Sequence, residues 1–148
     1  DMSKRTEKRQ IKWDLRFLDL AEHISEWSKD PSTKVGAVIT FGNRLISIGY
    51  NGLPQSVPDA KKILNNREEK YKYIIHAEMN AILTAGRDLT GCTLYTTPFL
   101  PCTNCASMVI QSGIVRVVAD KCKREDWKLR IEESKKLFSK ANIEVVEY

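Results

Sequence analysis

His76-Ala77-Glu78 and Pro101-Cys102-Thr103-Asn104-Cys105 are the two stretches from which the rest of this sequence is interpreted. A histidine followed by two cysteines spaced C-x₂-C is a ligand set for zinc. Three protein ligands leave the fourth position of a tetrahedral zinc open for water. A closed structural site has no use for the acid at Glu78, whereas an activated water needs a proton acceptor beside it. The pattern therefore predicts a catalytic zinc site with ligands His76, Cys102 and Cys105 and with Glu78 as proton shuttle.

Both groups of ligands fall at the expected start of a helix. The apolar spacing within residues 77–86 predicts one helix, and Pro101 precedes a second one that is predicted over 102–111. Two helix N-termini that point at one spot concentrate free N–H groups and partial positive charge there. This environment favours the thiolate form that Cys102 and Cys105 must take to bind a metal.

The remaining sequence alternates between strand and helix patterns around these two helices. Apolar runs predict strands over 35–41, 44–50, 92–97, 114–119 and 143–146, and amphipathic patterns predict further helices over 13–28 and 123–140. Gly42-Asn43 is typical of a hairpin turn between the first two strands, and helices of this length between the later strands imply parallel crossovers. We therefore expect an α/β fold of three layers, α/β/α, with a five-stranded mixed sheet that begins with an antiparallel hairpin and continues with parallel strands.

Length and charge indicate one domain with a basic extension. The 148 residues suffice for a single core, which we place in 13–148, and residues 1–12 form a basic lead-in that we expect to be flexible. The net charge of +5 is concentrated there, because 1–12 contribute five Lys or Arg against Asp1 and Glu7. We interpret this segment as a solvated tail, with a nucleic-acid-binding arm as the alternative.

The cysteines favour metal binding over disulfides. Four cysteines could form two bridges, but C-x₂-C with an upstream histidine, in a sequence without an apolar secretory segment, is typical of a metal site. Cys92 and Cys122 are then expected to be buried free thiols.

No run of the sequence approaches the roughly 18 apolar residues of a membrane span. We expect a cytoplasmic protein without membrane association.

A non-catalytic, zinc-stapled binding module is the alternative from another functional class. Such a module needs a fourth protein ligand. Cys92, Cys122 and His23 are the unassigned candidates, and none has a partner at ligand-like spacing.

Four blocks of the sequence together resemble a known family. They are SKDPSTKVGAVI at 28–39, GYNGLP at 49–54, HAEMNAIL at 76–83 and PCTNCA at 101–106. The last two carry the H-x-E and P-C-x-x-C signature of zinc-dependent nucleobase deaminases. The whole is similar to the cytidine/deoxycytidylate deaminase superfamily and, through the first two blocks, to deoxycytidylate (dCMP) deaminases. The resemblance extends over nearly the whole chain from about Trp13.

This resemblance implies a cytidine-deaminase-like fold and hydrolytic deamination of dCMP to dUMP and ammonia, which would supply dUMP for thymidylate synthesis. Deamination of another pyrimidine nucleotide (dCTP) or of a tRNA base is the alternative. It also implies substrate contacts: Asn51 to the deoxyribose 3′-hydroxyl, Ser28 and Lys29 to the 5′-phosphate, and the backbone at Val35, Gly36, Ala37 and Ala77 to the base. Asn51 in an Asn-Gly pair could instead be only a turn residue, and Lys29 only a solvated loop charge.

Some relatives of this kind hold a second, structural zinc in a middle segment; residues 55–72 here contain neither cysteine nor histidine, so we expect one zinc per chain. Relatives of this kind are commonly homohexamers that dCTP activates and dTTP inhibits, with Mg²⁺ at a separate effector site. The resemblance implies that Tyr50, Asn51 and Gly52 lie close to such a site. Nucleotide substrate and effectors, and further copies of the chain, are therefore the expected partners, and nucleic acid is not.

Overall fold

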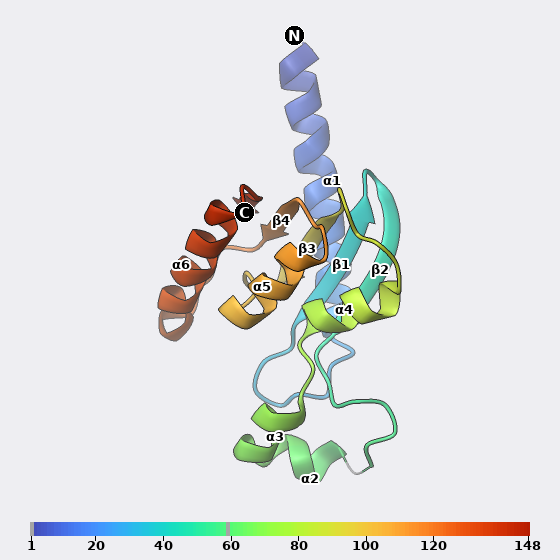
Figure 1. Ribbon diagram of the computed structural model, residues 1–148, viewed down its shortest axis with the longest axis vertical. Coiled ribbons are helices and arrows are strands. Elements are labelled where there is room, and N and C mark those ends of the chain that lie inside the picture. Colours follow the sequence, from blue (N-terminus) through green and yellow to red (C-terminus); the bar gives the residue numbers. More distant parts are fainter. Residues whose placement is uncertain (1, 59) are drawn as a thin grey trace.

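A five-stranded mixed sheet forms the centre of the computed structural model, which describes residues 2–58 and 60–148 (Figure 1). Its strands are β1 (Gly36–Phe41), β2 (Arg44–Tyr50), β3 (Thr93–Thr97), β4 (Arg116–Ala119) and β5 (Glu144–Glu147), in the order β2-β1-β3-β4-β5. β1 is antiparallel to both β2 and β3, whereas β3, β4 and β5 are parallel. The expected sheet, with its hairpin followed by parallel strands, is confirmed.

Helices cover both faces of this sheet. They are α1 (Met2–Ser25), α2 (Ala60–Leu64), α3 (Arg67–Tyr73), α4 (Ala77–Ala85), α5 (Thr103–Gln111) and α6 (Glu125–Lys140). Side chains of β1 alternate between the two cores, because successive residues of a strand point to opposite faces. Val38 packs with α1, whereas Ala37 and Ile39 pack with α4, α5 and α6. The three-layer arrangement is therefore also confirmed.

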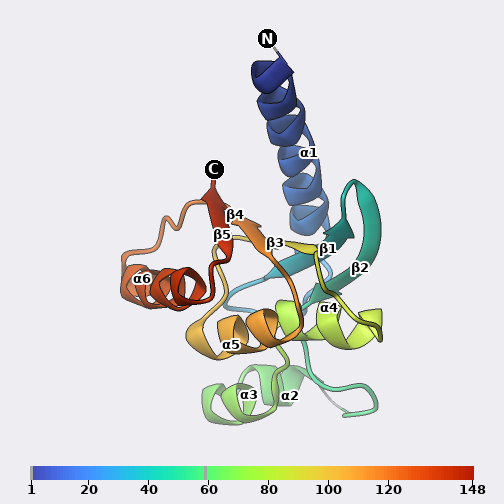
Figure 2. The same ribbon diagram turned by 45° about the horizontal axis from the view of Figure 1, so that its top comes forward.

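Helix α1 is longer than the sequence pattern predicted. Its apolar periodicity begins near Trp13, but the helix begins at Met2, so the described part of the lead-in, 2–12, is helical and exposed (Figure 2). Residues 2–12 contain no glycine or proline and are rich in good helix formers, so the helix continues beyond its packed part. The flexibility of this segment stays a prediction, and Asp1 lies outside the described residues. Within residues 2–58 and 60–148, no helix has the length and apolar character that crossing a membrane requires.

Two glycines set how closely the helices approach the sheet. A Cβ added at Gly36 would lie 1.9 Å from the carbonyl oxygen of Ala21 in α1. One added at Gly49 would lie 2.5 Å from both the carbonyl oxygen of Ala77 and the amide nitrogen of Ala81 in α4. Only glycine permits this backbone approach. Gly49 therefore fixes the depth at which α4, the helix that follows His76, rests on the hairpin.

The buried carboxylate of Asp14 connects α1 to β3, to β4 and to the C-terminal residue by hydrogen bonds. Arg116 of β4 donates two hydrogen bonds to its carboxylate, both of 2.7 Å. The hydroxyls of Tyr95 and Tyr148 donate at 2.8 Å and 2.6 Å. Burial raises the pKa of the Asp14 carboxyl, but the hydrogen bonds from Arg116, Tyr148 and Tyr95 outweigh it and hold the pKa below its usual range.

Asp14→Asn is expected to lower the free energy of unfolding at pH 7 by about 1–3 kcal/mol, because it removes the charge-assisted hydrogen bonds with half-buried Arg116, which keeps its ion pair with the exposed Glu144. The folded-state pKa of Asp14 is depressed, so the carboxylate stabilises the fold above its unfolded pKa of about 3.9 and ceases to do so as pH falls through the folded value. Urea unfolding from pH 2 to 8 should therefore show a shallower acid decline in the variant. Asp19→Asn, an exposed change on the same helix, is the control; equal losses in both variants would contradict the assignment.

Candidate active site

The three predicted zinc ligands lie together where two helices begin. His76 immediately precedes α4, Cys102 immediately precedes α5, and Cys105 lies in the first turn of α5. The Nδ1 atom of His76 is 3.2 Å from the Cys105 sulfur and 3.7 Å from the Cys102 sulfur. For Zn–N and Zn–S bonds of usual length in a tetrahedron, the N···S separation is about 3.6 Å. The donor set and its spacing therefore fit a zinc ion.

The protonation of the two cysteines is also typical of a metal site. The hydrogen bond between their thiols lowers the pKa of Cys102 to about 4, and the same interaction raises that of Cys105, because one proton is shared between two sulfurs. The hydrogen bond with Cys102 raises the pKa of His76, against the opposing effect of burial. A divalent cation in place of the shared proton would hold both sulfurs as thiolates.

No fourth side chain joins the cluster within residues 2–58 and 60–148. Among these residues, His76, Cys102 and Cys105 are the one group of histidine, cysteine or acidic side chains whose ligand atoms all lie within 4.8 Å of each other. Cys92 and Cys122, free thiols as expected, and His23 all lie outside it; Cys92 is buried and Cys122 half-buried. The described part of the chain thus supplies three protein ligands, as catalytic zinc sites do.

Glu78 lies beside the cluster, in the first turn of α4. Its side chain is 3% exposed, and the Cys105 thiol donates a hydrogen bond to its carboxylate. Burial raises the pKa of Glu78, an effect that the neighbouring charge of His76 opposes. A carboxyl group with a raised pKa is suited to accept and return a proton near neutral pH.

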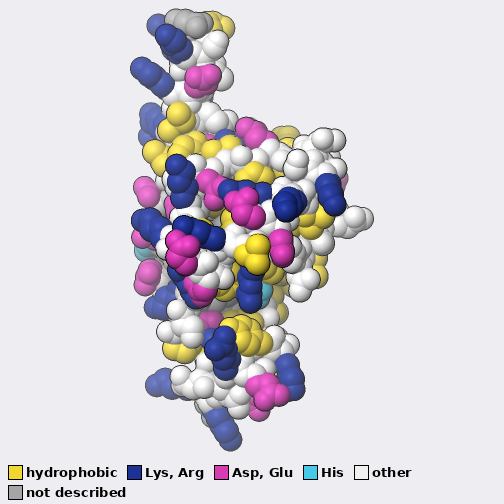
Figure 3. Space-filling view, turned by 90° about the vertical axis from the view of Figure 1, so that its left-hand side faces the viewer, with side chains coloured by type: hydrophobic (Ala, Val, Ile, Leu, Met, Phe, Trp, Pro, Cys, Tyr) yellow, Lys and Arg dark blue, Asp and Glu magenta, His cyan; other side chains and the backbone are white. Residues whose placement is uncertain are grey.

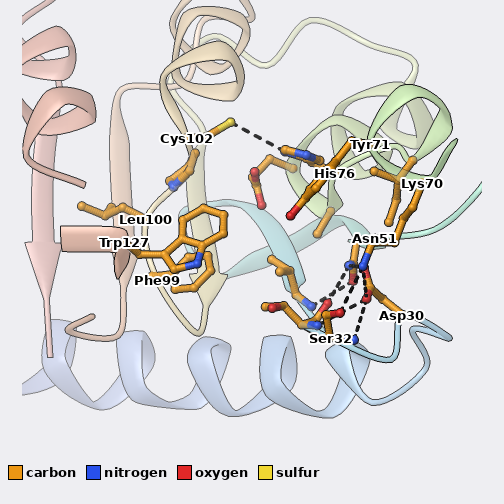
Figure 4. A pocket seen from close by; sticks show the side chains of 16 residues that line it. Asp30, Ser32, Asn51, Lys70, Tyr71, His76, Phe99, Leu100, Cys102 and Trp127 are labelled. Carbon is orange, nitrogen blue, oxygen red and sulfur yellow. Dashed lines mark hydrogen bonds and ion pairs between the residues drawn. The ribbon is translucent and has the colours of Figure 1, made fainter. Parts of the chain in front are cut away.

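A cavity extends from Glu78 and the candidate ligands (Figure 4). Phe99, Leu100 and Trp127 form one side, with the rings of Phe99 and Trp127 stacked at 4.6 Å. The opposite side carries polar side chains and one aromatic ring: Asp30, Ser32, Asn51, Lys70 and Tyr71. One apolar side and one polar side are typical of a pocket that orients a small polar molecule.

Asn51 lines this cavity and also holds the loop that precedes β1. Its Oδ1 atom accepts a hydrogen bond from the Val35 amide at 2.9 Å, and its Nδ2 atom donates to the Thr33 carbonyl at 2.9 Å and to Asp30 at 3.4 Å. Asn51 is thus more than a turn residue. Its contact with a deoxyribose hydroxyl stays a prediction.

A buried ion pair ties α3 to the same loop. The Nζ atom of Lys70 is 3.2 Å from Oδ1 of Asp30, and both side chains are 7% exposed. Lys70 also donates to the hydroxyl of Ser32 at 3.2 Å. Helices α2 and α3 project together from the body of the molecule (Figure 1). The ion pair therefore holds this projection over the cavity.

The predicted phosphate contacts lie outside the cavity lining. The Ser28 hydroxyl is buried and donates to the Asn51 carbonyl at 2.9 Å, while it accepts from the Asp30 amide at 3.2 Å. Lys29 is exposed, and neither residue is among those that line the cavity. The structure therefore does not bring these two side chains to the cavity, and their role as phosphate ligands stays a prediction.

The structure places only two of the four residues predicted to hold the base at the cavity. Val35 and Ala77 line the cavity. Gly36 and Ala37 belong to β1, are paired with β2 and β3, and are not among the lining residues. Sequence reasoning therefore found one end of this backbone segment at the site and missed Lys70, Tyr71 and Trp127, whose positions depend on contacts distant in sequence.

The residues assigned to an effector site lie at the end of β2. Tyr50 is 40% exposed, and its carbonyl accepts a hydrogen bond from Asn80 at 2.8 Å. Gly52 forms an isolated bridge with Ile75, with N···O distances of 3.1 Å and 2.8 Å. This bridge closes the base of the α2–α3 projection.

Comparison with known proteins agrees with this geometry. Residues 11–121 match the family described as the cytidine and deoxycytidylate deaminase zinc-binding region. An uncharacterized deaminase of Aliivibrio fischeri is 49% identical over 138 residues, which cover 90% of this chain and 92% of that protein. Deoxycytidylate deaminase of Mus musculus is 37% identical over 115 residues, which cover 73% of this chain but only 64% of the mouse protein.

A solved structure has the same fold. The dCMP deaminase of the cyanophage S-TIM5, in complex with dCMP and dUMP, has a TM-score of 0.73 and 23% identity, over 94% of this chain and 97% of that chain. The matched region of the sequence family includes His76, Glu78, Cys102 and Cys105. The chain belongs to the family of zinc-binding cytidine and deoxycytidylate deaminases.

Proposed function

We propose that this protein is a zinc-dependent hydrolase that converts dCMP to dUMP and ammonia. The observation that carries the proposal is the buried Glu78 carboxyl beside a cluster of three zinc ligands, at the end of a cavity with one apolar and one polar side. The similarity to the mouse deoxycytidylate deaminase supports dCMP as the substrate.

The chemistry is divided between the metal and the protein. When bound by His76, Cys102 and Cys105, zinc supplies a Lewis acid that lowers the pKa of water from about 16 to about 7. Glu78 accepts one proton of the attacking water and delivers it to the ring nitrogen of cytosine. It then takes the second proton from the new hydroxyl at C4 and gives it to the departing amino group. Across the reaction the C4–N bond breaks, the oxygen of water becomes the new carbonyl, and ammonia leaves.

The walls of the cavity position the base for this proton transfer. Phe99 and Leu100 are 6% and 1% exposed, so the apolar side is rigid and excludes water from the base. On the polar side, Asn51 and the Asp30–Lys70 pair hold the loop from Ser28 to Val35 in one arrangement. Our proposal assigns sugar recognition to this side, with Asn51 near the deoxyribose 3′-hydroxyl.

Several finer parts of the proposal rest on the resemblance alone. They are a homohexameric assembly, activation by dCTP, inhibition by dTTP with Mg²⁺ near Tyr50, Asn51 and Gly52, a cytoplasmic location, and supply of dUMP to thymidylate synthesis. The zinc-stapled module is disfavoured, since the described residues offer no fourth ligand.

The substrate assignment is tested by turnover of dCMP, dCTP, cytidine and a tRNA anticodon stem-loop, with release of ammonia as the readout. We expect the highest kcat/KM for dCMP. Deamination of the tRNA stem-loop with dCMP untouched would overturn the assignment of substrate. Absence of turnover on all four by zinc-loaded protein would overturn the assignment as an enzyme of this class.

A further inference from the structure

A second, larger cavity adjoins the candidate active site. It has a volume of about 680 Å³ and shares Ser32, Thr33, Lys70, Tyr71 and Trp127 with the first cavity. It lies between the α2–α3 projection and the start of α6. Figure 3, which faces α6, shows Lys and Arg side chains both on that projection and on the body above it. A molecule bound at Glu78 can therefore extend into this second space.

The lining of the second cavity is strongly basic. Arg67 comes from α3, Arg124 immediately precedes α6, and Arg130 comes from α6. Lys70 also lines it but is already paired with Asp30. Asp126 is the single acidic side chain among the residues that line this cavity. Three arginines against one carboxylate make the space suited to an anion.

Aromatic rings hold the arginines in place. The guanidinium carbon of Arg130 lies 4.7 Å from the centroid of the Trp127 ring, and that of Arg124 lies 5.4 Å from it. On α3, the guanidinium carbon of Arg67 lies 5.4 Å from the centroid of the Tyr71 ring, one turn further along the same helix. Such cation–π contacts orient a guanidinium, whose five N–H donors suit planar, bidentate binding of phosphate oxygens.

Arg124 is the most strongly constrained of the three. Its Nη1 atom donates to the Thr33 hydroxyl at 2.8 Å, and its Nη2 and Nε atoms donate to Asp126 at 2.9 Å and 3.3 Å. It thereby connects α6 to the loop that Asn51 and Asp30 hold. Arg67 and Arg130 line the space from α3 and α6, and within the described residues neither guanidinium donates a side-chain hydrogen bond, so they are the better candidates for direct contact.

We propose that Arg67 and Arg130, with Arg124 as support, bind the 5′-phosphate of the nucleotide substrate. The inference rests on the proposed function, since it takes the base to lie at Glu78 and the 5′ end to point past Tyr71 and Trp127. It assigns phosphate recognition to α3 and α6, and not to the Ser28 and Lys29 side chains, which lie outside both cavity linings.

Arg67→Ala and Arg130→Ala test this assignment in the zinc-loaded protein. Loss of a charge-assisted hydrogen bond to phosphate should lower kcat/KM for dCMP by about 10- to 100-fold, mainly through KM. Deoxycytidine, which has no phosphate, should be turned over by the variants as by the wild type. Arg130→Lys should recover part of the loss, because lysine restores the charge without the bidentate geometry.

Lys136→Ala is the matched control. Lys136 is an exposed cation on the same helix that does not line the cavity, so its removal changes the net charge equally. Thermal melting and zinc content of each variant show that the fold and the metal site are retained. Equal changes in Lys136→Ala and Arg130→Ala would assign the effect to overall charge and overturn the proposal.

The outcomes separate this inference from the proposed function. If the wild type turns over dCMP and both arginine variants retain its KM, the phosphate site is wrong and the enzyme assignment stands. If the wild type deaminates no cytosine nucleotide, the phosphate site is tested by the affinity for dCMP, measured by calorimetry. Loss of dCMP binding in Arg67→Ala and Arg130→Ala then supports the site. Unchanged dCMP binding, or a loss confined to the tRNA stem-loop, overturns it.

Discussion

Glu78→Gln is expected to lower kcat for dCMP by about 10²- to 10⁴-fold, the range that a general acid–base group contributes. Glutamine has nearly the same shape, so it should fill the buried position, but it cannot accept a proton from water. Because the proposed reaction uses Glu78 both in the attack of water and in the departure of ammonia, we expect the loss to lie in kcat more than in KM. Steady-state kinetics and zinc content of the purified variant provide the measurement.

The matched control is Glu133→Gln, an exposed position on α6 that is expected to keep the wild-type rate. A Glu78→Gln protein with full zinc and a near-wild-type rate would show that another group moves the proton. A variant that has lost its zinc would instead show that Glu78 supports the metal site, since its carboxyl group lies beside Cys105.

Cys105→Ser should remove most of the bound zinc and all measurable deamination. Cys105 is 4% exposed and lies 3.2 Å from the His76 nitrogen, so its loss leaves two side chains, too few for stable binding. Because a ligand that binds only the folded state stabilises it, the variant should also lose the rise in melting temperature that added zinc gives to the wild type. Metal analysis, ammonia release and melting curves with and without zinc measure the three effects.

Cys122→Ser is the control for this change. Cys122 is half-buried, lies outside the cluster, and its thiol donates to the Arg124 carbonyl, a bond that serine can also make. Zinc content near one per chain in this variant, and near zero in Cys105→Ser, is the expected pair of results. Unchanged zinc in Cys105→Ser would contradict the ligand assignment.

The candidate ligands were predictable because each ligand group is a short local motif, although His76 and Cys102 are 26 residues apart. Each ligand group precedes or opens a helix, and the short spacing from Cys102 to Cys105 is one helical turn, so sequence separation translates directly into geometry. The strands were predictable for the same reason, because β-rich apolar runs bounded by turn residues mark them. The start of α1 was not, since residues 2–12 have helix propensity without any packed face to reveal it.

The polar side of the cavity was beyond sequence reasoning for a different reason. Whether a loop hydroxyl is available to a ligand depends on whether the fold already uses it, and Ser28 is bonded to Asn51, 23 residues away. Lys70 is paired with Asp30 across 40 residues, and Arg124 with Thr33 across 91. No periodicity in the sequence signals such pairs, so the residues that surround a substrate appear only in three dimensions.

The α2–α3 projection gives this fold a separable part. The Gly52–Ile75 bridge and the bonds of Lys70 to Asp30 and Ser32 connect it to the body, whereas the candidate metal ligands and Glu78 lie at the starts of α4 and α5. Part of the cavity lining, namely Arg67, Lys70 and Tyr71, thus resides in a different piece of the chain from the candidate reaction centre. A graft that exchanges residues 53–74 and preserves both anchor points would leave the reaction centre intact, so this segment is the natural place for evolution, or for an engineer, to redirect the enzyme toward another substrate.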